Sequence, residues 1–124
     1  MNKTILIVED ELPLLNVLYE KFGREGFNVL KAVNGEEGLK NALSNKPDLI
    51  LLDIIMPKMD GITMLRELRK DEWGKSAKVV ILTNLSSATS VDEGIRHGVF
   101  TFLVKTNWKL EEVVSKVKTL LGIN

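Results

Sequence analysis

The stretch Leu49-Ile50-Leu51-Leu52-Asp53 has four consecutive apolar residues followed directly by an acid. A second stretch, Ile5-Leu6-Ile7-Val8, has the same character and is followed by Glu9-Asp10-Glu11. A strand without polar residues in alternation is typical of a parallel sheet that is covered by helices on both faces. These two stretches therefore predict an α/β fold.

The rest of the chain alternates short apolar runs with longer segments of helical period. Strands are expected at residues 5–8, 28–32, 49–52, 78–82 and 101–104, and helices at 13–25, 35–45, 61–70, 86–97 and 110–121. Right-handed connections between parallel strands place helices on both faces of the sheet. We expect a three-layer (βα)5 sandwich, with a doubly wound parallel sheet, in one domain over residues 1–124.

Composition excludes several classes of function. The 124 residues contain 17 Lys+Arg and 17 Asp+Glu, so no surplus of positive charge favours direct binding of nucleic acid or of an anionic membrane. The chain has no Cys and a single histidine, His97, so any metal would be held by oxygen ligands. The first apolar run, four residues long, is too short for a signal peptide or a membrane span, so a cytoplasmic protein is expected.

Polar residues whose side chains could bind a ligand or take part in catalysis follow the predicted strands. Glu9-Asp10-Glu11 follows the first strand, Asp53 the third, Thr83 the fourth and Lys105 the fifth. Because ligand sites in such sheets lie at the carboxyl ends of the strands, these side chains are expected to converge. Each also has a simpler interpretation: Asp10 or Glu11 could cap a helix, Thr83 could lie in a turn, and Lys105 could be a surface charge.

Several carboxylates at one edge repel one another and call for a cation. A small divalent ion with oxygen ligands, Mg²⁺, suits this set best, and it completes its shell with water and phosphate oxygens. A lysine and a threonine at the same edge suit further phosphoryl oxygens, and an aspartate there can attack phosphorus to form an acyl phosphate.

Four motifs together resemble the receiver domain of two-component response regulators, over essentially the whole chain. They are ILIVED at 5–10, LDIIMPKMDG at 52–61, ILT at 81–83 and GVFTFLVK at 98–105. The resemblance implies a flavodoxin-like sheet with strand order 2-1-3-4-5, in a signalling phosphoacceptor that catalyses only its own phosphorylation and dephosphorylation.

The resemblance also implies a role for each matching residue at the metal. Asp53 would be the phosphoacceptor, and Asp10 would bind Mg²⁺ directly together with Asp53. Glu9 would contribute through a water molecule, and the backbone carbonyl of Ile55 would complete the protein ligands.

Three further residues would read out the phosphorylated state. Lys105 would bind the phosphoryl group, and Thr83 would move to hydrogen-bond it once it is formed. Phe102 matches the family's switch aromatic, which changes rotamer as Thr83 moves; the alternative is an ordinary core residue. The surface of the fourth helix, fifth strand and fifth helix would carry the signal to an unknown protein target.

The expected phosphodonor is a histidine kinase or a histidine phosphotransfer protein. In the first helix, Leu14, Val17, Leu18 and Phe22 are spaced as a core face, which leaves Leu12, Leu15 and Tyr19 as a second apolar stripe for docking. The alternative is a wide core face with Leu15 half-buried. A phosphorylation-dependent homodimer is left open.

Two departures from the family keep a second hypothesis open. Thr106 stands where receivers usually have proline after the lysine, and Asn84 stands where a small residue usually follows the threonine. A degenerate receiver that acts as a phosphorylation-independent scaffold is therefore an alternative. A Mg²⁺-dependent aspartyl phosphatase is more remote, because Glu9-Asp10-Glu11 lacks that superfamily's Asp-x-Asp pair. A flavodoxin-like binding module is also disfavoured, because these acids would repel the phosphate of its ligand.

Overall fold

Five parallel strands form a single sheet in the order β2-β1-β3-β4-β5. The structure is a computed structural model that describes residues 3–53, 56, 58–83, 101–104 and 109–123. Its elements, in chain order, are β1 (Thr4–Val8), α1 (Leu12–Arg24), β2 (Asn28–Ala32), α2 (Gly35–Asn45), β3 (Leu49–Leu52), α3 (Gly61–Leu68), a short 3₁₀ helix (Gly74–Ser76), β4 (Val79–Thr83), β5 (Thr101–Val104) and α5 (Leu110–Leu120). The strand order and parallel α/β architecture match the expectation from the sequence.

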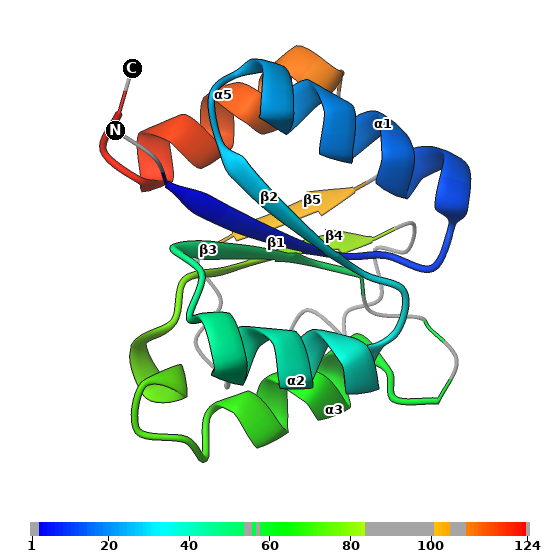
Figure 1. The fold of residues 1–124 in the computed structure, drawn as a ribbon, viewed down its shortest axis with the longest axis vertical. Coiled ribbons are helices and arrows are strands. Elements are labelled where there is room, and N and C mark those ends of the chain that lie inside the picture. Colours follow the sequence, from blue (N-terminus) through cyan, green and yellow to red (C-terminus); the bar gives the residue numbers. More distant parts are fainter. Residues whose placement is uncertain (1–2, 54–55, 57, 84–100, 105–108, 124) are drawn as a thin grey trace.

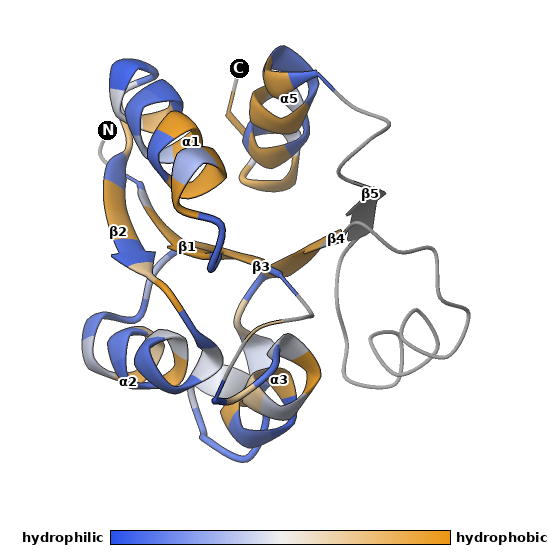
Figure 2. Ribbon diagram, turned by 90° about the vertical axis from the view of Figure 1, so that its right-hand side faces the viewer, coloured by the Kyte–Doolittle hydropathy of each residue, from blue (hydrophilic) through white to orange (hydrophobic). Residues whose placement is uncertain are grey.

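Helices cover the sheet on both faces, with α1 and α5 on one side and α2 and α3 on the other (Figure 1). Successive residues of a strand point to opposite faces, so each strand serves two cores. Leu6, Val8, Ile50, Leu52 and Ile81 pack toward α2 and α3, while Ile5, Ile7, Leu49, Leu51 and Val80 pack toward α1 and α5. Figure 2 shows the apolar strands lying between helices whose outer sides are hydrophilic. The unbroken apolar runs are therefore explained by burial on both faces.

Local signals explain where the helices begin. The buried side chain of Asn34 caps α2 by accepting a hydrogen bond from the Glu37 amide (2.8 Å), and Asp60 caps α3 through the Thr63 amide (2.8 Å). Pro13 lies in the first turn of α1, where its missing N–H group costs nothing. The helix begins one residue earlier than predicted, because Leu12 already has helical geometry behind the cap residue Glu11.

Other boundaries differ from the prediction by one or two residues. The helix predicted over 61–70 ends at Leu68, where the chain turns and the Asp71 amide donates to the Leu68 carbonyl (3.1 Å). The fourth strand is shifted by one residue, to Val79–Thr83. The helix predicted over 86–97 lies outside the described residues.

The orientation of α1 differs from the prediction. Leu15, Leu18 and Phe22 are the buried residues of this helix, with Leu15 only 2% exposed, whereas Val17 is 50% exposed. Leu15 therefore belongs to the core shared with α5, and its predicted place on an exposed docking stripe is wrong. The residues of α1 that do present large apolar side chains to solvent are Leu12, Val17 and Tyr19.

None of the helices in the described part of the chain has both the length and the apolar character needed to cross a membrane.

Candidate functional site

The carboxyl ends of β1 and β3 lie side by side at the centre of the sheet. Val8 and Leu52 are paired residues at the ends of these strands, so Glu9 and Asp53 emerge together. The backbone is held beyond the strands as well: the Asp53 amide donates to the Val8 carbonyl (3.0 Å) and the Glu9 amide to the Ala32 carbonyl (3.0 Å). The pairing of β1 with β3 thus fixes the backbone positions of Glu9 and Asp53.

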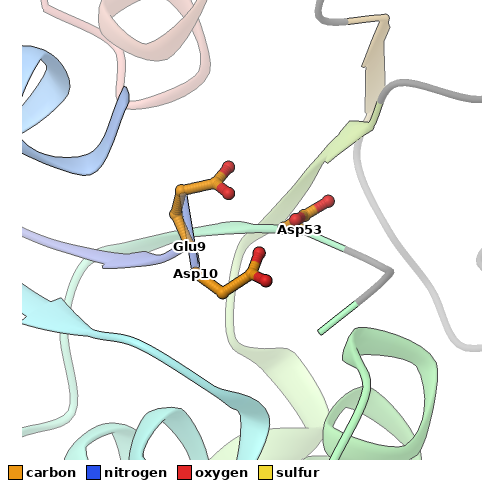
Figure 3. A group of neighbouring side chains, drawn as sticks. All are labelled: Glu9, Asp10 and Asp53. Carbon is orange, nitrogen blue, oxygen red and sulfur yellow. The ribbon is translucent and has the colours of Figure 1, made fainter. Parts of the chain in front are cut away.

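Glu9, Asp10 and Asp53 form a compact acidic cluster (Figure 3). One carboxylate oxygen from each lies within 4.8 Å of the others. Glu9 is 1% exposed and Asp53 is 5% exposed, while Asp10 is partly exposed. Burying carboxylates beside one another is unfavourable in water-poor surroundings unless positive charge or hydrogen bonds compensate. The close approach of these three carboxylates is therefore electrostatically unfavourable, and such arrangements are typical of functional sites.

Glu11 does not share this arrangement. Its side chain is exposed and makes no capping hydrogen bond to α1, so the simple capping interpretation fails for Glu11. Its backbone amide instead donates to Oε2 of Glu9 (3.0 Å), which orients the Glu9 carboxylate. Glu11 thus contributes to the cluster through its backbone amide and not through its carboxylate.

The donor set fits a small divalent cation. Three carboxylates offer hard oxygen ligands, and ligand oxygens on opposite sides of a Mg²⁺ ion lie about 4 Å apart. The oxygens of the cluster, which lie within 4.8 Å of one another, are therefore close enough together to face one ion. Asp10 and Asp53 would hold the ion, and Glu9 would support it.

The remaining predicted site residues are described only in part. Thr83 ends β4 and is paired with Val104 of β5, so the backbone of these strands places their carboxyl ends at the same edge as Asp53. Phe102 lies within β5. Ile55 and Lys105, as well as Asn84 and Thr106, lie outside the described residues.

The predicted docking helix begins next to the acidic cluster. Tyr19 is 39% exposed, and the Lys31 ammonium group lies 4.3 Å from the centroid of its ring. Leu12, at the start of the helix, is 56% exposed. Of the three residues predicted for the docking stripe, Leu12 and Tyr19 are on the surface and Leu15 is buried.

One feature near the site was missed in the sequence. The amide of Gly35, the first residue of α2, donates to the carbonyl of Met59 in the connection that follows Asp53 (2.8 Å). The pair Asn34-Gly35 signals a helix start, but no sequence signal shows which loop the helix would touch.

The whole chain is similar to proteins of known type. The family model for the response regulator receiver domain matches residues 5–118. The sporulation initiation phosphotransferase F of Bacillus subtilis is 32% identical over 123 residues, which are 99% of this chain and 97% of that protein. The alkaline phosphatase synthesis transcriptional regulatory protein PhoP of the same organism is 36% identical over 98% of this chain, but this chain spans only 49% of its length.

Solved structures agree. A CheY-like receiver domain protein from Methanospirillum hungatei superposes with a TM-score of 0.91 at 25% identity, covering 98% of this chain and 95% of the other. The CheX-CheY-BeF₃-Mg complex from Borrelia burgdorferi matches with a TM-score of 0.83 at 34% identity, covering 95% of this chain and 88% of the other.

Proposed function

The chain belongs to the response regulator receiver domain family, and from this premise we propose that Asp53 accepts a phosphoryl group in a Mg²⁺-dependent transfer. The observation that carries the proposal is the acidic cluster, in which a 5%-exposed aspartate lies beside Glu9 and Asp10 at the carboxyl edge of the sheet. The proposed setting is the cytoplasm, and the proposed output is a signal rather than a released product.

In the proposed reaction, a carboxylate oxygen of Asp53 attacks the phosphorus of a phosphohistidine or a small acyl phosphate. A new P–O bond forms as the bond to the donor's imidazole nitrogen or carboxylate oxygen breaks, and the leaving group keeps the electron pair. Bound Mg²⁺ would supply neutralising charge for the phosphoryl oxygens. The chain's own contribution is to hold the attacking carboxylate in place through the Asp53 amide and the β1–β3 ladder.

The metal ligands proposed are Asp10, Asp53 and the backbone carbonyl of Ile55, with Glu9 acting through water. Two supports for this set are the close approach of the three carboxylates and the orientation of Glu9 by the Glu11 amide. Lys105 and Thr83 are proposed to bind the phosphoryl group, and Phe102 to follow Thr83 in the switch.

The proposed phosphodonor is a histidine kinase or histidine phosphotransfer protein that docks on α1. Tyr19 and Leu12 are the exposed apolar residues on which this docking would rest. Leu15 is buried and so does not belong to this docking surface. Its truncation to alanine would destabilise the fold by about 2–5 kcal/mol, and a loss of phosphotransfer in that variant would therefore not report on docking. A downstream protein target and a phosphorylation-dependent homodimer remain part of the proposal.

Two substitutions favour a second candidate, a scaffold that works without phosphorylation. Thr106 and Asn84 replace the residues that receivers usually have beside the lysine and the threonine. In the sequence they directly follow Thr83 and Lys105, the two residues proposed to bind the phosphoryl group, so the second candidate is a receiver fold in which transfer is suppressed.

Incubation with radiolabelled acetyl phosphate, and separately with beryllofluoride, distinguishes the two candidates. We expect Mg²⁺-dependent labelling of the wild type that is abolished by Asp53→Asn and retained by Asp60→Asn. Asp60 is a matched control, because it is an exposed aspartate in the same connection and asparagine caps a helix equally well. A wild-type protein that responds to neither reagent in the presence of Mg²⁺ would contradict phosphoryl transfer and favour the scaffold.

A further inference from the structure

The first turn of α2 touches the connection that runs from Asp53 to α3. The Gly35 amide donates to the Met59 carbonyl, and Gly35 itself is buried. A β-carbon built on Gly35 would overlap the carbonyl group of Met59 and would meet the carbonyl oxygen of Asp60. The close approach of two backbones at this point therefore requires glycine.

Gly74 meets the backbone of Leu68 in a similar way, but two glycines within the long helices have different surroundings. A β-carbon on Gly23, in α1, would have no neighbour within 4 Å. One on Gly38, a turn further along α2, would meet side-chain atoms of Val8 and Met64 at 2.9 Å rather than backbone. At Gly35 the obstacle is backbone, which cannot rotate away.

The connection that Gly35 contacts is anchored at both ends. The Asp53 amide is bonded to the Val8 carbonyl at one end, and Met56, only 8% exposed, packs in the core beneath α2 and α3. At the other end Asp60 caps α3, whose residues Met64, Leu65 and Leu68 are fully buried. Met59 therefore lies between two held points, one of which is Asp53 itself.

A second contact ties α2 to the same cluster through β1. Gly38 packs against the side chain of Val8, which directly precedes Glu9 and whose carbonyl receives the Asp53 amide. The first turns of α2 thus contact β1 and the connection that follows β3, and Figure 2 shows α2 beneath β2 and β1.

We infer that Gly35 is a positioning residue for the acidic cluster: by allowing α2 to approach Met59, it sets the position of Met59 between Asp53 and α3 and so how closely Asp53 meets Glu9 and Asp10. The inference rests on the proposed Mg²⁺-dependent function. The metal affinity of the cluster then depends on a glycine that touches none of its carboxylates.

Calorimetric titration of the folded protein with MgCl₂, well below the unfolding temperature, tests whether Mg²⁺ affinity depends on Gly35. Gly35→Ala is expected to weaken Mg²⁺ binding about tenfold, and to slow labelling by acetyl phosphate at saturating Mg²⁺, because an ångström of misplacement is enough to do so. Gly23→Ala, the same exchange in an open position of a helix, should leave Mg²⁺ affinity within about twofold of the wild type.

A second pair of variants decides the matter if Gly35→Ala does not fold. Asn34→Ala removes the cap that holds the first turn of α2, whereas Lys40→Gly destabilises the same helix at an exposed position away from Met59, each by about 1 kcal/mol. Weaker Mg²⁺ binding in Asn34→Ala than in Lys40→Gly supports positioning, and equal binding overturns it.

The outcomes also separate this inference from the proposed function. If the wild type and Gly23→Ala bind Mg²⁺ and are labelled, and folded Gly35→Ala matches them, positioning by Gly35 is refuted while the phosphoacceptor function stands. If the wild type itself binds no Mg²⁺, the proposed function fails first.

Discussion

Lys46 ends α2 in the left-handed region, with φ 46° and ψ 62°, and its amide donates to the Ala42 carbonyl (2.8 Å). This conformation crowds the β-carbon of any residue other than glycine, at a cost of roughly 1–2 kcal/mol. Lys46 is exposed, so its side chain stays in solvent at this helix end.

Replacement of Lys46 with glycine should therefore stabilise the protein. The expected gain is about 0.5–1 kcal/mol after the greater flexibility of glycine in the unfolded chain is subtracted. Urea denaturation at neutral pH measures it. Lys40→Gly, the same exchange within the helix, should instead lose about 1 kcal/mol, and a loss in both variants would contradict the explanation.

Single residues also show how far the sequence predicts the site. Asp53 and Glu9 could be predicted because each directly follows an apolar strand, and parallel strands bring their carboxyl ends together. The contact between Gly35 and Met59 could not, because it joins the start of α2 to a loop, and their separation depends on how closely α2 and α3 pack. Local patterns carry no information about such an approach.

The orientation of α1 is a property of the element rather than of its residues. Apolar side chains occur on most sides of this helix, so the helical period alone leaves more than one candidate core face. The neighbouring α5 decides between them: Leu15, Leu18 and Phe22 share a core with Val113 and Val117, and Val17 is turned outward. This is why the predicted faces of α1 were partly wrong although its position in the chain was right.

Ion pairs join α1 to α5 beside that core. Lys118 donates to Oε1 of Glu25 (2.7 Å), and Lys21 lies 3.4 Å from Oε2 of the same carboxylate while also donating to Glu111. The hydrogen bond from Lys118, with its positive charge, lowers the pKa of Glu25 below its ordinary value of 4.5. The charged form of Glu25 is thus favoured by folding.

A lowered pKa in the folded state predicts the direction of a pH effect. The contribution of Glu25 to stability is fully present above pH 4.5 and is lost as the pH falls through its lowered folded pKa. Urea denaturation from pH 7 to pH 3 should show Glu25→Gln less stable than the wild type at neutral pH, with the difference narrowing in acid. Glu20→Gln, which breaks only an exposed pair with Arg24 within α1, is the control. A difference for Glu25→Gln that does not change with pH would argue against the ion pairs as its cause.

Charge is balanced over the whole molecule and unbalanced at one place. The 17 basic and 17 acidic residues cancel in the sum, and the ion pairs between α1 and α5 balance locally. The acidic cluster differs, because Glu9, Asp10 and Asp53 meet at the centre of the sheet edge. Because the pairing of β1 with β3 holds Glu9 and Asp53 at neighbouring strand ends, the repulsion within the cluster lowers the free energy of unfolding of the whole domain.

Mg²⁺ should therefore stabilise the entire fold. A ligand that binds only the folded state at a hundred times its dissociation constant adds about 2.7 kcal/mol, which for a chain of this size raises the unfolding temperature by roughly 10 °C. Asp10→Asn should lose most of this response and, without Mg²⁺, should melt above the wild type, because one repulsive charge is gone. Differential scanning calorimetry with MgCl₂, and with NaCl at equal ionic strength, separates binding from general screening. An equal rise in NaCl, or an undiminished Mg²⁺ response in Asp10→Asn, would show that the cluster is not where the ion acts.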